Sequence, residues 1–200
     1  MLAKSRQRGF NVIEVMVTVA VLALLLAVGV PSMAEWVRNT HVRNLAETIQ
    51  NGLQKARTES LRRNKVVTFW MVTPATGIPD ATCTLSAASG SWVISLDDPS
   101  GKCNLDPSAT TAPRLIEVYG AGSSATGVTV TGLASDGATA AKSVSFNGFG
   151  QTVSTGTQLA RIDVAHTLSG ARRLRIQIST GGGVRMCDQD VSTTDPRACH

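Results

Sequence analysis

The stretch RQRGFNVIEVMVTVAVLALLLAVGVP, residues 6–31, combines a long apolar run with a single carboxylate, Glu14, near its start. No charged residue follows from Val15 to Ala34, and roughly 20 apolar residues in a helix cross the hydrocarbon core of a bilayer. Basic residues precede the run and place the N-terminus in the cytoplasm by the positive-inside rule; they are Lys4, Arg6 and Arg8. We therefore predict a transmembrane helix over residues 10–34, with the rest of the chain beyond the cytoplasmic membrane.

Two ordinary explanations of this segment leave Glu14 unexplained. A secretory signal peptide would end at a small-x-small site such as Ser32-Met33-Ala34, and a plain membrane anchor needs no acid. A carboxylate at the centre of a membrane helix costs roughly 2.5–3.5 kcal/mol and is usually functional. Its natural partner is a cation at the same depth, which a free amine at Phe10 would supply if the chain were cut after Gly9.

The residues RGFNVIEVMVT, 8–18, resemble the class III signal of type IV pilins and type II secretion pseudopilins. The resemblance implies that a prepilin peptidase cuts after Gly9, so that residues 1–9 are a leader, and that the new N-terminal Phe10 is methylated. It also implies that Glu14 pairs with the terminal amine of a neighbouring subunit and sets the register of docking. Such a buried pair gives little net stability, so its value lies in penalising a misregistered subunit. Pro31 stands where pilins often carry a helix-bending proline.

A helical stripe continues beyond the apolar run. Its apolar residues recur at spacings of three and four, which is the period of an α-helix with one buried face; they are Val42, Leu45, Ala46, Ile49, Leu53 and Ala56. Charged residues occupy the other faces and indicate a solvated surface. We therefore predict one helix from residue 10 to about residue 63, whose second part, 35–64, is amphipathic and packs its stripe against a sheet.

From Lys65 onward the pattern changes to short β-rich runs separated by Gly, Pro, Asp and Ser. In RLRIQIS, residues 173–179, apolar and polar side chains alternate, as in a strand with one buried and one wet face. Similar runs lie at residues 65–72, 91–96, 114–119, 127–132, 142–150 and 159–166. The fold class expected is α+β and type IV pilin-like: a long N-terminal helix packed on an antiparallel β-sandwich over residues 65–200.

Two segments of the β-rich part resemble a narrower group within the pilins and pseudopilins. VSFNGFG, residues 144–150, and RRLRIQISTGGGVRMC, residues 172–187, are similar to the FimT/FimU group of type IV minor pilins and to GspH, the minor pseudopilin of type II secretion. The resemblance implies a minor pilin in a tip or priming subcomplex of the pilus, with a single inner-membrane pass and a periplasmic domain. A GspH-like role in protein export stays open, because both use the same anchor and fold. The implied partners are the prepilin peptidase, other minor pilins, the major pilin, the inner-membrane assembly platform and membrane lipid.

The four cysteines suit an oxidising compartment. Three pairings are open to four cysteines, and nearness in sequence favours Cys83 with Cys103 and Cys187 with Cys199. Loops of this length stabilise a domain by about 2–4 kcal/mol. A zinc site is disfavoured, because no C-x-x-C pair is present and the chain has only three histidines. We expect neither a metal nor another cofactor.

No catalytic motif accompanies this architecture. The chain lacks the G-x-S-x-G, H-E-x-x-H and phosphate-loop patterns. Asp97-Asp98, beside Pro99 and Gly101, indicates a turn rather than an acid pair. We therefore expect a structural protein that is a substrate of the peptidase, not an enzyme.

DNA capture during natural transformation is a hypothesis of a different class. Some FimT proteins bind DNA through a C-terminal Gly-Arg-x-Arg segment, and the matching stretch here, residues 182–185, keeps only Arg185. Three arginines could compensate if strand pairing brings them close to it: Arg172, Arg173 and Arg175. Basic and acidic residues nearly balance once the leader is removed, so any DNA binding should be weak and driven by phosphate contacts. The alternative is an ordinary solvated strand face.

Overall fold

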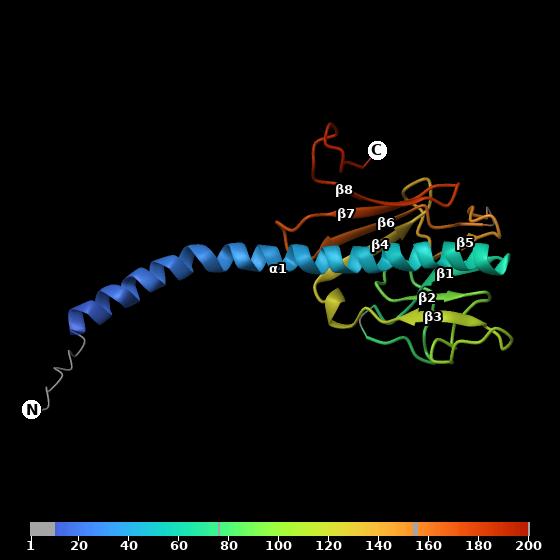
Figure 1. The fold of residues 1–200 in the computed structure, drawn as a ribbon, viewed down its shortest axis with the longest axis horizontal. Coiled ribbons are helices and arrows are strands. Elements are labelled where there is room, and N and C mark those ends of the chain that lie inside the picture. Colours follow the sequence, from blue (N-terminus) through green and yellow to red (C-terminus); the bar gives the residue numbers. More distant parts are fainter. Residues whose placement is uncertain (1–10, 76, 154–155, 200) are drawn as a thin grey trace, which may run out of the picture. The chain divides into compact units, whose positions relative to one another are not determined.

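The computed structural model describes residues 11–75, 77–153 and 156–199, apart from the side chains of residues 28–32 and of Ser124. The chain divides into two compact units, Met1–Val37 and Arg38–His200, and the helix α1 (Val12–Arg63) contributes residues to both. Figure 1 shows the second half of α1 beside the strands of the second unit. A single helix that ends near residue 63 was predicted from the sequence, and the structure confirms it.

The end of α1 is a Schellman motif built on Asn64. This residue has a positive φ of 48°, a left-handed conformation that Asn tolerates better than most residues and that often follows a helix. The Asn64 amide donates to the Leu61 carbonyl at 3.3 Å, and the Lys65 amide donates to the Ser60 carbonyl at 3.3 Å. These two bonds satisfy carbonyls of the last turn and direct the chain into the first strand.

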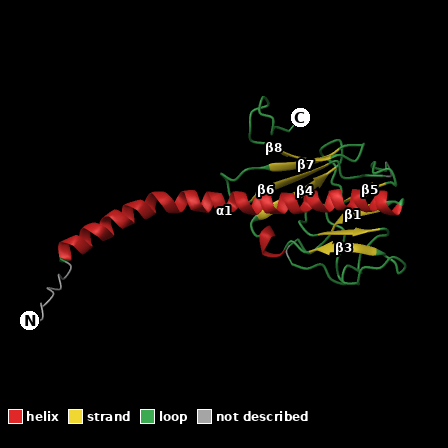
Figure 2. Cartoon of the chain, in the orientation of Figure 1, coloured by secondary structure: helices red, strands yellow, loops and turns green. Residues whose placement is uncertain are grey.

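Two four-stranded antiparallel sheets follow the helix (Figure 2). The first has the order β3-β2-β1-β5 and consists of β1 (Val67–Met71), β2 (Trp92–Ser95), β3 (Leu115–Tyr119) and β5 (Ser143–Phe146). The second has the order β4-β6-β7-β8 and consists of β4 (Val128–Leu133), β6 (Arg161–His166), β7 (Leu174–Ile178) and β8 (Val184–Asp188). A short 3₁₀ helix, η1 (Gly122–Ala125), connects β3 with β4. The α+β class with two antiparallel sheets is confirmed; the strand β8 was not among the predicted runs.

One hydrophobic core joins the second half of α1 to both sheets. The six stripe residues on α1 are buried, each at most 1% exposed. Side chains of both sheets pack on them, among them Phe69 of β1, Ile162 of β6 and Ile176 of β7. Full burial of a large apolar side chain stabilises a fold by about 1.5–3 kcal/mol, so the stripe fixes residues 42–56 firmly within the second unit.

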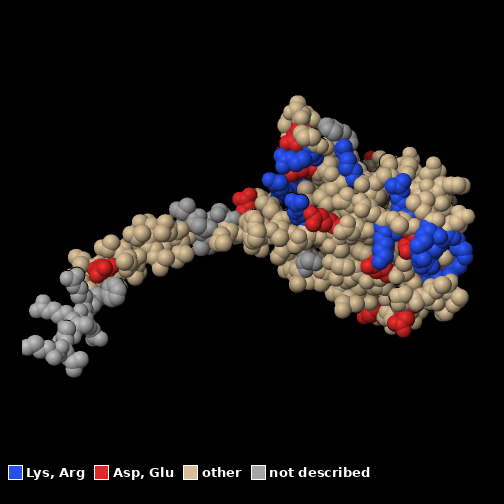
Figure 3. Space-filling model, viewed as in Figure 1, with Lys and Arg blue, Asp and Glu red and all other residues tan. Residues whose placement is uncertain are grey.

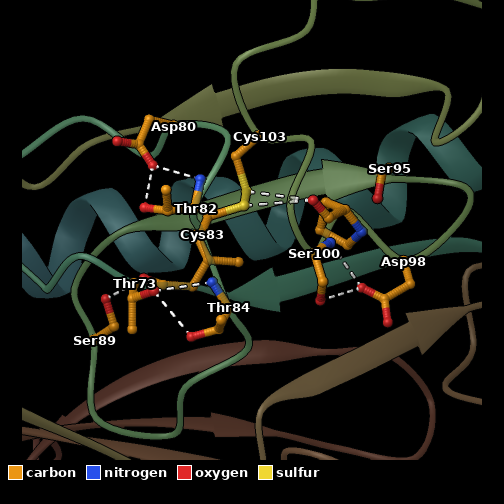
Figure 4. The surroundings of a disulfide bond; sticks show 12 residues. Thr73, Asp80, Thr82, Cys83, Thr84, Ser89, Ser95, Asp98, Ser100 and Cys103 are labelled. Carbon is orange, nitrogen blue, oxygen red and sulfur yellow. Dashed lines mark hydrogen bonds between the residues drawn. A yellow bond between two sulfur atoms is a disulfide. The ribbon is translucent and has the colours of Figure 1, made fainter.

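A second, smaller core lies on the opposite face of the first sheet. It contains Val72, Val93 and Leu115 together with Cys83 and Cys103, which form a disulfide. Residues of β2 therefore face buried surroundings on both sides, and all four are buried. The loops that carry the two cysteines supply this cover, because the disulfide ties them together over the sheet (Figure 4).

Side-chain hydrogen bonds shape the turns of these loops (Figure 4). Asp80 Oδ1 accepts from the Thr82 amide at 2.8 Å. Asp98 Oδ1 accepts from the Ser100 amide at 2.9 Å. The neighbouring Asp97 Oδ2 accepts from Arg114 Nε at 2.7 Å, and hydrogen bonds from that guanidinium lower the pKa of the Asp97 carboxyl. The two adjacent acids thus form a turn, as the sequence indicated.

Gly52 is expected to tolerate alanine poorly, although alanine favours helices. A Cβ at this position of α1 would lie 2.8 Å from two ring atoms of Trp92 and 3.0 Å from Phe69. The Trp92 ring is itself held between Phe69 and Tyr119, with ring centroids 5.6 and 5.2 Å away. The gain in helix propensity is about 1 kcal/mol, whereas overpacking a core costs about 1–3 kcal/mol.

Gly52→Ala should therefore lower the free energy of unfolding, by about 1 kcal/mol as the difference of these two effects. Denaturant unfolding of the full chain in mild detergent measures it. Asn51→Ala is the matched control, since Asn51 is an exposed neighbour on the same helix and should gain stability. An increase for Gly52→Ala would contradict the tight contact with Trp92.

Candidate functional site

The first unit exposes an apolar helix surface that carries one charge. The large apolar side chains from Val12 to Leu26 are 48 to 73% exposed. Glu14 is exposed in the same segment, where its amide donates to the Asn11 carbonyl at 3.0 Å in the first turn of α1. Contiguous apolar surface of this kind marks a site of contact with protein or membrane. Within this surface, the Glu14 carboxylate is the charged group that a partner would have to match.

Several predicted sites of the N-terminal segment fall outside what the structure describes. Gly9 and Phe10 lie outside the described residues, and so does the side chain of Pro31. Processing, methylation and the helix bend therefore stay predictions. Among the residues that the structure describes, no helix has both the length and the hydropathy needed to cross a membrane. The span predicted over residues 10–34 also stays a prediction.

The candidate DNA-binding arginines gather on and beside the second sheet. Strands β7 and β8 pair Gln177 with Arg185 and Arg175 with Cys187. Residues directly opposite each other share a face of an antiparallel sheet. Arg175 and Arg185 therefore lie on the same face, and the pair Ile176–Met186 separates their positions along the strands. Strand pairing thus brings these arginines together, which the DNA hypothesis required.

Two of these arginines are held by carboxylates from other strands and loops. Arg175 Nε lies 2.6 Å from Asp163 Oδ1 on β6, and this hydrogen bond raises the pKa of the guanidinium. Arg173 Nε lies 2.7 Å from Asp190 Oδ1 beyond β8. Hydrogen bonds from Arg173 lower the pKa of the Asp190 carboxyl. In each pair the carboxylate offsets the positive charge of the guanidinium.

The other two arginines differ in their surroundings. Arg172 Nη1 lies 4.0 Å from Asp188 Oδ2, and the Asp188 side chain is 6% exposed. Arg185 Nη2 donates to uncharged acceptors instead, Gln177 Oε1 at 3.3 Å and the Ala198 carbonyl at 3.4 Å. Counting the nearby carboxylates, the four arginines carry a net charge of about one, which favours the solvated strand face over a phosphate site.

Sequence reasoning named the arginines but missed their acidic partners. Asp163 stands opposite Arg175 in the β6–β7 register, and Asp190 reaches Arg173 from the segment after β8. No local spacing signals either contact, because each depends on which strands become neighbours. The alternation of Ile162, Asp163 and Val164 places the acid on the solvent-exposed face of β6. This alternation is the one sequence pattern that indicates an acidic partner on that face of the sheet.

The C-terminal tail is fixed against β8. Cys187 of β8 forms a disulfide with Cys199, so both bridges favoured by sequence nearness are present in the structure. Next to it, Asp188 forms an isolated parallel bridge with Ala198. The tail therefore covers part of the sheet edge and supplies the carbonyl that contacts Arg185. No group of three or more metal-ligating side chains occurs in the described residues.

The arrangement defines a pilin-like subunit: a long helix with an apolar exposed start, a buried stripe in its second half and an antiparallel β domain around that stripe. The chain belongs to the family described as type II transport protein GspH, whose family model matches residues 45–182. The matched range includes the stripe from Leu45 onward and both sheets up to β7. It ends before Arg185 and the Cys187–Cys199 bridge, and it begins after Glu14.

Two crystal structures of the type IV minor pilin FimU from Pseudomonas aeruginosa strain PAO1 are similar to the chain at 13% identity. The form in space group P21 gives a TM-score of 0.48 and covers 82% of this chain and 99% of that one. The form in space group P65 gives 0.44 and covers 79% and 99%. A comparison with curated proteins found no match.

Proposed function

We propose that this chain is a minor pilin of a type IV pilus and joins a subcomplex that starts or caps the filament. The exposed apolar surface from Val12 to Leu26, interrupted by Glu14, carries the proposal. Such a helix needs a cover, which the inner membrane supplies before assembly and neighbouring pilin helices supply afterwards. The second half of α1 has its stripe covered already, so it attaches the globular unit to this anchor.

The proposed role sets the chain's location and contacts. The anchor crosses the inner membrane once and the second unit lies in the periplasm, where the two disulfides form in an oxidising environment. Prepilin peptidase, the assembly platform, the major pilin and other minor pilins are its partners. Its contribution is structural rather than catalytic, and it needs no cofactor.

Processing at the class III signal is the first expected result. The mature chain should begin at Phe10 with a methylated amine, because Gly9-Phe10 heads an intact signal with Glu14 at the right spacing. Intact-mass measurement of protein extracted from membranes checks both the cleavage and the methyl group. A mature chain that begins at Glu35 would identify an ordinary signal peptide and refute the proposal.

A minor pseudopilin of type II secretion is the second candidate, and the description of the matching family favours it. Deleting the gene separates the two roles. Loss of surface pili with normal export of secreted enzymes supports the pilus assignment. If the deletion strain has normal pili but retains its exported proteins in the periplasm, the result supports a role in type II secretion. Recovery of the chain in pili sheared from the parent strain, which keeps the gene, is the direct test of its presence in the filament.

A further inference from the structure

The segment Arg57–Lys65, which begins in the last turns of α1, carries an unbalanced positive charge. It contains four basic residues and one acid, Glu59. Glu59 Oε2 lies 2.7 Å from Arg62 Nη2 and 2.7 Å from Arg63 Nε, so one carboxylate serves two guanidiniums. Figure 3 shows Lys and Arg side chains gathered at the end of the second unit where α1 ends. The net charge of this segment is about three, compared with about one for the arginines of the second sheet.

A tight turn presents a phenylalanine beside this segment. Phe149 is 81% exposed and sits in the turn Asn147–Gly150. Asn147 Oδ1 accepts from the amides of Phe149 and Gln151, each at 3.0 Å, and the Gly150 amide donates to the Asn147 carbonyl at 2.8 Å. The backbone and Asn147 therefore fix the turn, and its shape does not depend on burying the Phe149 ring.

Contacts on both sides of Phe149 hold the turn against α1. Arg57 Nε donates to the Gly150 carbonyl at 3.0 Å, and a Cβ at Gly150 would lie 3.3 Å from the Leu61 side chain. On the other side, Gly148 packs closely on Asn64. The exposed ring is thus placed at the end of the helix, next to the cations, on a support that is already ordered before any ligand binds.

We propose that Phe149 and the Arg57–Lys65 segment form a binding surface for single-stranded nucleic acid. The cations contact phosphates, and an unpaired base stacks on the ring of Phe149. Proteins that bind single strands without sequence preference combine a positive groove with exposed aromatic rings in this way. The proposal goes beyond the filament role and does not depend on it, since the surface belongs wholly to the second unit.

The composition of the surface favours nucleic acid over a lipid bilayer. Its exposed apolar side chains are few: besides Phe149 there are Leu61, next to the turn, and Val66, just after Lys65, each about half exposed. Binding to a membrane surface scales with the buried apolar area of a broad hydrophobic face, which three side chains do not provide. One fixed aromatic ring among several cations is sufficient for stacking and phosphate contact.

The proposal is tested by fluorescence anisotropy. The probe is a labelled 20-nucleotide oligo-dT, and the protein is the full chain in nonionic detergent. Phe149→Ala should weaken binding roughly 5- to 150-fold, the range for loss of one stacked base, and Phe149→Trp should retain it. The matched control is Ile78→Ala, because Ile78 is also 81% exposed and lies in another loop. Unchanged affinity for Phe149→Ala would overturn the stacking role.

A salt series tests the cations separately. Arg62→Gln with Lys65→Gln should reduce the slope of log affinity against log salt by about 1.4, since each phosphate contact on a single strand contributes about 0.7. Arg43→Gln is the control, because Arg43 pairs with Glu47 at 2.7 Å on the same helix and should leave the slope unchanged. Loss of binding in Arg173→Ala/Arg175→Ala instead would assign the site to the second sheet and overturn the proposal.

Three further outcomes are decisive. Absence of binding at low salt would overturn the proposal. Equal affinity for a duplex of the same length, insensitive to Phe149, would show charge attraction alone and overturn it as well. Binding to vesicles with anionic lipid, lost in Phe149→Ala and without oligonucleotide binding, would identify a membrane surface instead.

Discussion

Replacing Glu14 by alanine is expected to remove this chain from filaments while leaving it inserted in the membrane. The side chain is the one charge between Asn11 and Ala34, so its loss makes insertion easier. In the assembled filament, however, the terminal amine of the neighbouring subunit would lose its partner in an apolar environment. An unpaired charge at that depth costs roughly 2.5–3.5 kcal/mol, which corresponds to about a hundredfold in an equilibrium.

The measurement is the amount of chain recovered in sheared pili relative to the amount in membranes. Glu14→Gln separates charge from hydrogen bonding and should be almost as defective as alanine, because the amide cannot neutralise an ammonium group. Thr18→Ala is the control: Thr18 lies one turn further along α1, and its hydroxyl donates to the Val15 carbonyl of its own helix at 2.9 Å. Normal incorporation of Glu14→Ala would refute the role in register and leave the carboxylate unexplained.

The elements that the sequence predicts best are those whose residues share one physical requirement. The stripe from Val42 to Ala56 repeats at the period of a helix, and every member is buried. In β7 the alternation of Ile176 and Ile178 with Arg175 and Gln177 predicts one buried face, and both isoleucines are buried. Periodicity succeeds in these cases because a single continuous core covers the whole element.

The burial of other strands depends on which segments of the chain pack over them, and the local sequence pattern does not indicate those segments. The strand β8 follows three glycines at residues 181–183, and its pattern of partial burial gives a weak alternation. The strand β2 is buried on both faces because loops tied by Cys83–Cys103 close over it. In the candidate DNA site, the spacing revealed the arginines, but their neutralisation by Asp163 and Asp190 emerges only from strand order.

We expect a substitution at Gly182 to destabilise the second unit strongly, because two turns approach each other closely there. This residue has a φ of 77°, a conformation that costs an alanine roughly 1–2 kcal/mol. A Cβ there would also overlap the carbonyl oxygen of Gly150, which is a backbone atom and cannot rotate away. That carbonyl accepts from Arg57 at 3.0 Å, so a shift of the turn weakens its attachment to α1 as well.

Gly182→Ala should therefore lower the free energy of unfolding by roughly 3 kcal/mol, the combined cost of a strained backbone and a displaced turn. The control stands next to it: Gly181 has no atom within 4 Å of an added Cβ, so Gly181→Ala should change stability by less than about 0.5 kcal/mol. Denaturant unfolding of the full chain in mild detergent compares the two. Equal stability of both variants would show that the turns at Gly150 and Gly182 separate without cost, and the ordered support beneath Phe149 would then have to be abandoned.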